Sequence, residues 1–169
     1  MKIAVFGSAF NPPSLGHKSV IERLSHFDKV LLVPSISHAW GKEMLPFDTR
    51  IDMVLTFIDE FNSNVELSCI ESELYVPKQS VTTFSLLTYL QEKNPDADIT
   101  FIIGPDNLMK FSQFFKADEI AKKWNVMACP ETLPIRSTDI RHAIKNGHDI
   151  SHLTTKGVSQ YIKAHQLYE

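Results

Sequence analysis

Hydrophobic residues along this chain follow two alternating spacings, one typical of buried strands and one typical of helices. Short continuous apolar runs, each bounded by Gly, Pro or polar residues, predict strands. Between them, apolar residues recur every three or four positions, which predicts helices. The predicted strands are 3–6, 30–33, 65–69, 99–103 and 126–129, and helical spacing is found at 20–27, 51–58, 84–90, 120–124, 138–146 and 155–166.

The ends of several helices carry their own signals. We expect Asp48 and Ser80 to act as N-caps, because short polar side chains accept hydrogen bonds from free amides there. Gly147 fits the end of the helix at 138–146, where a left-handed residue is common. Strands that alternate with helices favour parallel βαβ units with helices on both faces of a sheet. The sequence therefore predicts an α/β fold, a doubly wound parallel sheet in a single domain over residues 1–169.

Composition narrows the function classes. The net charge of -3 and the pI of about 6.2 disfavour a protein that coats nucleic acid. No apolar run approaches the roughly 18 residues of a membrane helix, and the start resembles no signal peptide. Cys69 and Cys129 form no CxxC pair and are expected to be buried thiols in a reducing compartment. We therefore expect a cytoplasmic protein that binds neither nucleic acid nor membrane.

Open parallel sheets bind ligands at the carboxyl ends of their strands, so the loop at 7–17 is the first candidate site. We expect Gly7 to turn the chain sharply off its strand and Gly16 to permit a close approach at the helix entry. His17 falls in the first helical turn, where free amides and the helix dipole favour an anion. This pattern predicts a phosphate beside His17. The alternative is a histidine that only caps or packs the turn.

A second candidate lies at 134–141, before and within a predicted helix. Ser137 and Thr138 are good N-cap residues, and Arg141 follows one turn later. Two hydroxyls, free amides and a guanidinium together can hold a polyphosphate. The alternative is a well-capped surface helix with an exposed arginine.

Four segments together resemble a known family. Residues 7–17 resemble a GxFxPxHxGH segment, 102–106 an IIGxD segment, 135–141 an ISSTxxR segment and 158–168 a VxxYIxxHxLY segment. Their order and span, 3–168, resemble the nucleotidyltransferase superfamily of the (H/T)xGH type. Within it, the chain is most similar to the nicotinate-nucleotide (nicotinamide-nucleotide) adenylyltransferases.

The resemblance implies a Rossmann-like sheet and a transfer of AMP from ATP to nicotinate or nicotinamide mononucleotide, with release of pyrophosphate. The attacking phosphate is already an anion, so positioning and charge stabilisation can carry the reaction. Mg2+ is expected to be bound through the ATP phosphates, because the sequence shows no acidic metal-ligand cluster. The expected partners are these small molecules, and the oligomeric state, a homo-oligomer included, stays open.

The resemblance also implies roles for single residues. The expected catalytic residues are His17, Ser14 and Arg141. The expected ATP-binding residues are Gly7, Ala9, Phe10, Ser14, His17, Asp106, Arg136, Ser137, Thr138 and Arg141. The expected acceptor-binding residues are Asn11, Trp40, Lys42, Thr82 and Phe114.

Several positions depart from the family pattern. Ser14 stands where His or Thr is usual, Arg136 replaces the first Ser of its motif, and Asn11 replaces an aspartate. Trp40 and Lys42 fit an acceptor loop, or else an exposed loop without that role. Two other functions therefore stay open: a related transferase with another phosphate-ester acceptor, such as phosphopantetheine, or a nucleotide-binding module with impaired catalysis because of Ser14.

Overall fold

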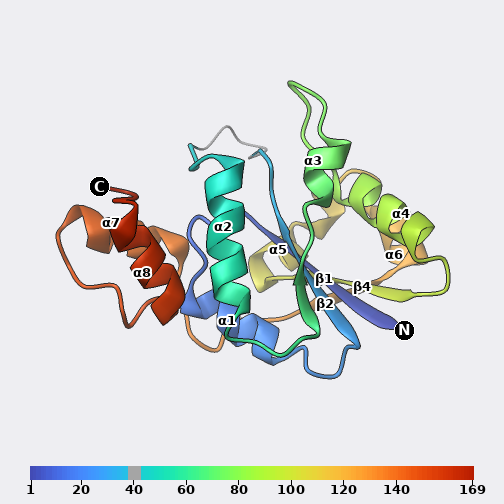
Figure 1. Cartoon of the computed structure of the whole chain (residues 1–169). Coiled ribbons are helices and arrows are strands. Elements are labelled where there is room, and N and C mark those ends of the chain that lie inside the picture. Colours follow the sequence, from blue (N-terminus) through green and yellow to red (C-terminus); the bar gives the residue numbers. More distant parts are fainter. Residues whose placement is uncertain (38–42) are drawn as a thin grey trace.

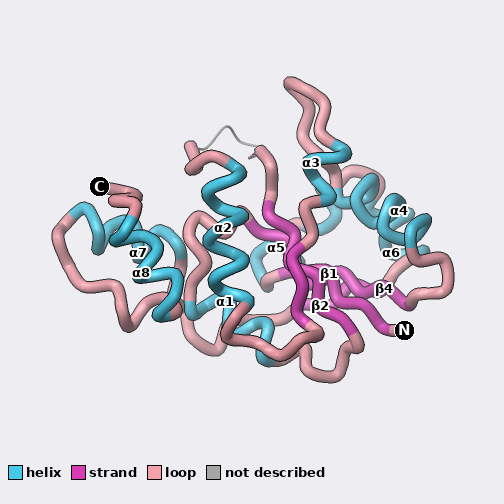
Figure 2. The backbone as a smooth tube through the Cα atoms, viewed as in Figure 1, coloured by secondary structure: helices cyan, strands magenta, loops and turns pink. Residues whose placement is uncertain are grey.

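The computed structural model describes residues 1–37 and 43–169, and its centre is one parallel sheet. All four strand pairings are parallel, and the strand order is β3-β2-β1-β4-β5. Figure 2 shows these strands side by side in magenta. The strands are β1 (Lys2–Ser8), β2 (Lys29–Pro34), β3 (Val65–Leu67), β4 (Asp98–Ile103) and β5 (Asn125–Ala128).

Helices connect the strands and cover both faces of the sheet (Figure 1). They are α1 (Leu15–Glu22), α2 (Phe47–Ile58), α3 (Ile70–Leu74), α4 (Thr83–Lys93), α5 (Pro105–Met109), α6 (Ala117–Lys123), α7 (Ser137–Lys145) and α8 (Lys156–Ala164), with a 3-10 turn η1 (Phe111–Gln113). The predicted α/β class and doubly wound parallel sheet are thereby confirmed. Within the described ranges, no helix has the length and apolar character needed to cross a membrane.

Alternation along the strands divides the interior into two cores. On β1, Ala4 and Phe6 point into the core beneath α1, α2, α7 and α8. Ile3 and Val5 point to the opposite side, into the core beneath α3, α4 and α6. A strand that is buried on both faces reads as a continuous apolar run, which is why β1 shows no polar alternation.

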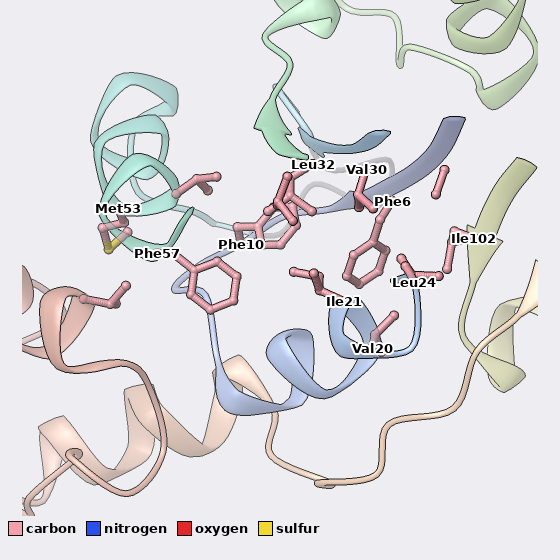
Figure 3. Packing of buried hydrophobic residues seen from close by; sticks show 14 of the residues in the cluster. Phe6, Phe10, Val20, Ile21, Leu24, Val30, Leu32, Met53, Phe57 and Ile102 are labelled. Carbon is pink, nitrogen blue, oxygen red and sulfur yellow. The ribbon is translucent and has the colours of Figure 1, made fainter. Parts of the chain in front are cut away.

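The loop after β1 is fixed by a side chain of its own. Phe10 is fully buried at a left-handed backbone position, φ 48°. Its ring packs edge-on against Phe6, at a centroid distance of 5.9 Å, and in a tilted arrangement against the His17 ring, at 4.7 Å. Figure 3 shows Phe10 among the aliphatic side chains of α1 and β2. The loop that carries the candidate chemistry is therefore anchored in the hydrophobic core.

Two predicted N-caps were wrong. Pro46 precedes α2, and Asp48 lies within the first turn, where its carboxylate still complements the helix dipole. Thr82, not Ser80, caps α4, because its hydroxyl accepts a 3.1 Å hydrogen bond from Ser85 N–H. At α4 the shift is local, because residues 80–82 contain two suitable cap residues, whereas α2 begins after Pro46 without a side-chain cap.

The prediction for Gly147 is confirmed. It has φ 69° and donates to Ile144 O, while His148 N–H donates to Ala143 O. This pair of hydrogen bonds is the Schellman arrangement that ends a helix.

Other differences concern short elements and one cysteine. The sequence did not indicate α3 or α5, which have only five residues each. Cys69 was expected to be buried but is exposed beyond the end of β3, whereas Cys129 is buried as expected. The apolar run at 65–69 is therefore a strand over only its first three residues.

Arg50 of α2 is a buried cation that is held by backbone carbonyls. It is 1% exposed, and its Nε donates to Leu45 O at 2.9 Å. Its Nη1 donates to Ala9 O at 2.9 Å and to Ser35 O at 2.6 Å, and its Nη2 lies 3.5 Å from Ile36 O. One guanidinium thus ties the first loop to both described ends of the β2–α2 connection.

We predict that Arg50→Lys lowers the free energy of unfolding by about 2–4 kcal/mol. Lysine keeps the charge but cannot reproduce the planar fork that reaches carbonyls on three segments. The measurement is urea unfolding followed by circular dichroism. Arg23→Lys, at an exposed position, is the control and should stay within about 0.5 kcal/mol. Equal effects at the two positions would contradict the structural role of Arg50.

Candidate active site

A cavity of about 490 Å3 opens at the carboxyl ends of β1, β4 and β5. This is the edge at which open parallel sheets bind their ligands. The predicted site residues that line it are Gly7, Ser14, His17, Asp106, Arg136 and Ser137. They come from three distant parts of the sequence, so the fold brings the first loop, the segment after β4 and the start of α7 to one cavity.

The starts of α1 and α7 lie in direct contact. Ser14 Oγ donates to Ile135 O at 3.0 Å, and Ser14 is only 1% exposed. A Cβ atom added to Gly16 would lie 2.2 Å from the same carbonyl oxygen. Only glycine therefore permits this approach, as the sequence predicted for Gly16.

Two further hydrogen bonds join the start of α7 to the first loop. Ser137 Oγ donates to Pro12 O at 2.6 Å, and Arg141 Nη1 donates to Asn11 O at 2.7 Å. Arg141 Nη2 also donates to Thr138 Oγ1 at 3.1 Å. These polar groups therefore hold the loop in place, in addition to any ligand that they contact.

The predicted capping of α7 by Ser137 or Thr138 was wrong. Arg136 is the N-cap residue, and Ser137 begins the helix. The Asp139 carboxylate accepts a 2.8 Å hydrogen bond from Arg136 N–H and so satisfies one free amide. Ser137 and Thr138 consequently stand in the first turn, where backbone amides lack partners within the helix.

His17 and Ser14 cap the start of α1 reciprocally. Ser14 Oγ accepts from His17 N–H at 3.2 Å, and His17 Nδ1 accepts from Ser14 N–H at 3.0 Å. Since Nδ1 is an acceptor, the ring proton of the neutral imidazole is on Nε2, which lies 2.9 Å from Ser8 Oγ. Burial lowers the pKa of His17 to about 4. The site thus presents a neutral histidine with an N–H donor at the cavity.

Ser14 uses its single hydroxyl proton within the protein. The proton goes to Ile135 O, and the oxygen accepts from His17 N–H. In this structure its role is to cap α1 and to join the two helix starts. The predicted role in catalysis stays a prediction.

Gly7 does not turn the chain, contrary to expectation. It lies within β1 and pairs with Val33 of β2, and the strand continues to Ser8. The sharp change of direction comes at Phe10, the left-handed residue of the loop. Ala9 uses its carbonyl oxygen to accept from Arg50, so any contact with a phosphate must come from its amide.

The predicted acceptor residues lie in different surroundings. Asn11 is 5% exposed and Thr82 caps α4, as described above. Phe114 is half-buried and packs edge-on against Phe101, at a centroid distance of 6.4 Å. Trp40 and Lys42 lie outside the described residues.

Ser8 and Glu131 belong to the site but were missed from the sequence. Ser8 Oγ meets His17 Nε2, and nothing distinguishes it from an ordinary loop serine in the sequence. Glu131 lines the cavity, and its Oε2 would lie 3.0 Å from a Cβ on Gly16. Burial raises the pKa of Glu131, which the positive charge of Arg136 opposes. Neither proximity follows from sequence spacing, because both depend on how the loops meet.

Comparison with known proteins assigns the chain to a family. Residues 5–143 match the model of the family described as cytidylyltransferase-like. The match includes both helix starts that line the cavity. This chain belongs to the cytidylyltransferase-like family.

Named relatives align with nearly the whole chain. A "Probable nicotinate-nucleotide adenylyltransferase" of Myxococcus xanthus is 30% identical, with 99% of this chain and 95% of the relative covered. The crystal structure of "a Putative Nicotinate-nucleotide Adenylyltransferase from Vibrio parahaemolyticus" is 55% identical, with a TM-score of 0.89 over 99% of this chain and 94% of that one. The family resemblance stated from the motifs is thereby confirmed.

A more distant solved structure supports the fold alone. It is the Plasmodium falciparum nicotinic acid mononucleotide adenylyltransferase complexed with NaAD. It is 18% identical, with a TM-score of 0.79 over 99% of this chain and 97% of that one.

We predict that Gly16→Ala destabilises the protein by about 2 kcal/mol, because the new methyl group would overlap Ile135 O. Urea unfolding provides the measurement. Gly104→Ala is the matched control, since a Cβ there meets no atom within 4 Å and its φ of -75° suits alanine. This control should be neutral or slightly stabilising. A harmless Gly16→Ala would show that α1 and α7 do not need this contact.

We also predict a pH-dependent loss of stability that belongs to His17. The folded protein takes up this proton near pH 4 and the unfolded chain near pH 6.5, so acidification between these values favours unfolding by up to about 3 kcal/mol. Urea unfolding of wild type and His17→Gln from pH 7 to pH 4.5 measures it. The free energy of unfolding of the wild type minus that of the variant should decrease as the pH is lowered from 7 to 4.5.

The variant is needed because Glu71 titrates with the opposite sign. Burial raises the pKa of this carboxyl from 4.5 to about 7. The hydrogen bond that it accepts from Ile36 N–H and the nearby charge of Arg50 oppose this shift. Its contribution to stability is present at low pH and is lost as the pH rises through 7. A pH-independent difference between wild type and His17→Gln would contradict the lowered pKa of His17.

Proposed function

We propose that this protein transfers AMP from ATP to a pyridine mononucleotide, nicotinate or nicotinamide mononucleotide, and releases pyrophosphate. The observation that carries the proposal is the convergence of two helix starts on one cavity, one with the neutral imidazole of His17 and the other with the hydroxyl of Ser137 and the guanidinium of Arg136. The names of the similar proteins support the same reaction.

In the proposed reaction, a phosphate oxygen of the mononucleotide forms a bond to the α-phosphorus of ATP. The bond from that phosphorus to the bridging oxygen of the β-phosphate breaks, and pyrophosphate leaves with the electron pair. The protein supplies no nucleophile. Its contribution is to align two anionic reactants and to stabilise charge on the phosphate oxygens.

His17 is the residue proposed to stabilise charge on the phosphate oxygens. With Nδ1 occupied by Ser14 N–H, its Nε2–H can turn from Ser8 Oγ to a phosphate oxygen between the α- and β-phosphorus atoms. Because the ring is neutral, it donates this hydrogen bond without transferring its proton. Gly7, Ala9 and Phe10 would offer backbone amides beside it.

The β- and γ-phosphates would lie against the start of α7. Its first amides lack helical partners, and Arg136 and Arg141 bring positive charge. Arg141 commits two N–H groups to Asn11 O and Thr138 Oγ1, which leaves three of its five donors for a ligand. Asp106 would face the ribose of ATP, and its Oδ2 lies 3.7 Å from Arg136 Nη2.

ATP is proposed to enter as its Mg2+ complex. Among the described residues that line the cavity, the carboxylates of Asp106 and Glu131 accompany one cation, Arg136, which disfavours a bare polyphosphate. Within the described residues, no group of three or more His, Cys, Asp or Glu side chains could hold a metal ion. The ion would therefore be carried by the phosphate oxygens, where it neutralises part of their charge.

The reaction can be tested directly. Purified protein is incubated with ATP, Mg2+ and either nicotinate mononucleotide, nicotinamide mononucleotide or pantetheine phosphate, and both pyrophosphate and the dinucleotide product are measured. We expect product from a pyridine mononucleotide. Product from pantetheine phosphate alone would replace the proposed acceptor, and ATP binding without turnover on any acceptor would indicate an impaired module.

We predict that His17→Ala lowers kcat by roughly 10²–10³, the cost of removing one preorganised donor. Steady-state kinetics with saturating ATP and mononucleotide measure the effect, and thermal unfolding at pH 7.5 shows whether the variant is folded. His26→Ala, at an exposed histidine, is the control and should retain wild-type kcat. A folded His17→Ala with near-wild-type kcat would refute the assigned role.

A further inference from the structure

The segment that follows α8 reaches back to the first loop. Tyr168 Oη donates a 2.7 Å hydrogen bond to Asn11 Oδ1. The two residues are 157 positions apart, and Asn11 is 5% exposed while Tyr168 is half-buried. Burial raises the pKa of Tyr168 above its ordinary value, so its hydroxyl keeps the proton that it donates.

A second donor shows which way the Asn11 carboxamide is turned. Leu45 N–H also points to Asn11 Oδ1, at 3.3 Å. A backbone N–H can only donate, so the atom that faces it must be the oxygen of the amide. Asn11 Nδ2 therefore lies on the other side of the carboxamide and offers N–H donors alone. An aspartate at this position would present a carboxylate oxygen there instead.

The backbone of Asn11 is held separately from its side chain. Its carbonyl oxygen accepts from Arg141 Nη1 on the side of α7, whereas its side chain is held by Tyr168 and Leu45. A change at Tyr168 can therefore alter the carboxamide without removing the link to α7. This separation makes the side-chain contact accessible to a selective test.

We propose that Tyr168 is a positioning residue that fixes the carboxamide of Asn11, so that its Nδ2 donates to an oxygen atom of the acceptor mononucleotide. The inference rests on the proposed function and on the acceptor-binding role that the family resemblance implies for Asn11. It adds the chemistry of the contact, which is donation to oxygen, and it assigns a role to a residue outside the candidate cavity. Without the Tyr168 hydroxyl, Oδ1 retains only the longer bond from Leu45 N–H, and the carboxamide can rotate.

Tyr168→Phe is the appropriate change because it removes one oxygen and keeps the ring. Tyr161→Phe is a matched control from the same part of the chain. Tyr161 Oη donates to Asp52 Oδ2 on α2 at 3.1 Å, so this variant also loses one phenol hydrogen bond that holds the α8 region. If the Tyr168 contact only stabilised the fold, the two variants would behave alike.

Two measurements on each variant test the inference. The first is the KM for ATP and for the mononucleotide, with thermal unfolding as a check on folding. The second needs no turnover: mononucleotide is titrated without ATP into protein labelled with 15N-asparagine, and the Asn11 side-chain amide signals give a Kd. Tyr168→Phe should raise the Kd and KM of the mononucleotide about three- to tenfold, the range for one hydrogen bond, and leave the KM of ATP within about twofold.

Asn11→Asp supplies an independent comparison. The carboxylate can still accept from Tyr168 and Leu45, but it replaces the N–H donors by an acceptor. We expect it to weaken mononucleotide binding at least tenfold, measured by calorimetry. Mononucleotide binding within twofold of wild type in Asn11→Asp would contradict donation by Nδ2.

The outcomes separate this inference from the proposed function. Turnover of a mononucleotide with an unchanged Kd in Tyr168→Phe, or an equal change in Tyr161→Phe, would overturn the role of Tyr168 alone. A rise in the KM of ATP as large as that of the mononucleotide would also overturn it. Mononucleotide binding that weakens as expected in a protein without turnover would defeat only the proposed function. No mononucleotide binding in the wild type would defeat both.

Discussion

The close approach of the α1 start to the backbone before α7 is the constraint on which the rest of the site depends. Ile135 O accepts from Ser14 Oγ and occupies the space in which any side chain at position 16 would begin. This contact brings the starts of α1 and α7 to one cavity, although 121 positions separate Ser14 from Ile135. Since each helix start alone favours an anion only weakly, their convergence is what can create a polyphosphate site.

The surroundings of the α1 start determine the state of His17. Its ring is packed against Phe10, its Nδ1 is taken by Ser14 N–H, and burial keeps it neutral at physiological pH. A charged imidazole would attract phosphate more strongly, but the dipole of α1 and desolvation both disfavour the charge. A neutral ring of fixed tautomer offers one directed N–H at little reorganisation cost, which is the property that a donor to a developing charge requires.

The sequence predicted the parallel sheet and its helices on both faces, because continuous apolar runs and helical spacing report burial directly. It also predicted the close contact at Gly16, because glycine has no side chain. It failed where the outcome depends on long-range contacts. Gly7 remains in a strand because β2 continues beside it, and the turn falls at Phe10 because the core accepts that ring. Arg136 replaces Ser137 as the N-cap, and Ser137 reaches Pro12 instead. Arg50 and Glu131 had no local signal, since their surroundings come from other segments.

Many polar side chains near the cavity are engaged with the protein itself. Ser14, Ser137, Arg141 and Arg50 all donate to backbone carbonyls of loops that meet at the first loop, and Asn11 receives donors from three separate segments. Such a network, when its groups are satisfied, fixes the loops relative to one another. If catalysis consists of aligning two anions rather than of nucleophilic attack by the protein, this rigidity is itself the catalytic device. The positioning residues then matter as much as the groups that touch the phosphates, and they can lie as far along the chain as Tyr168.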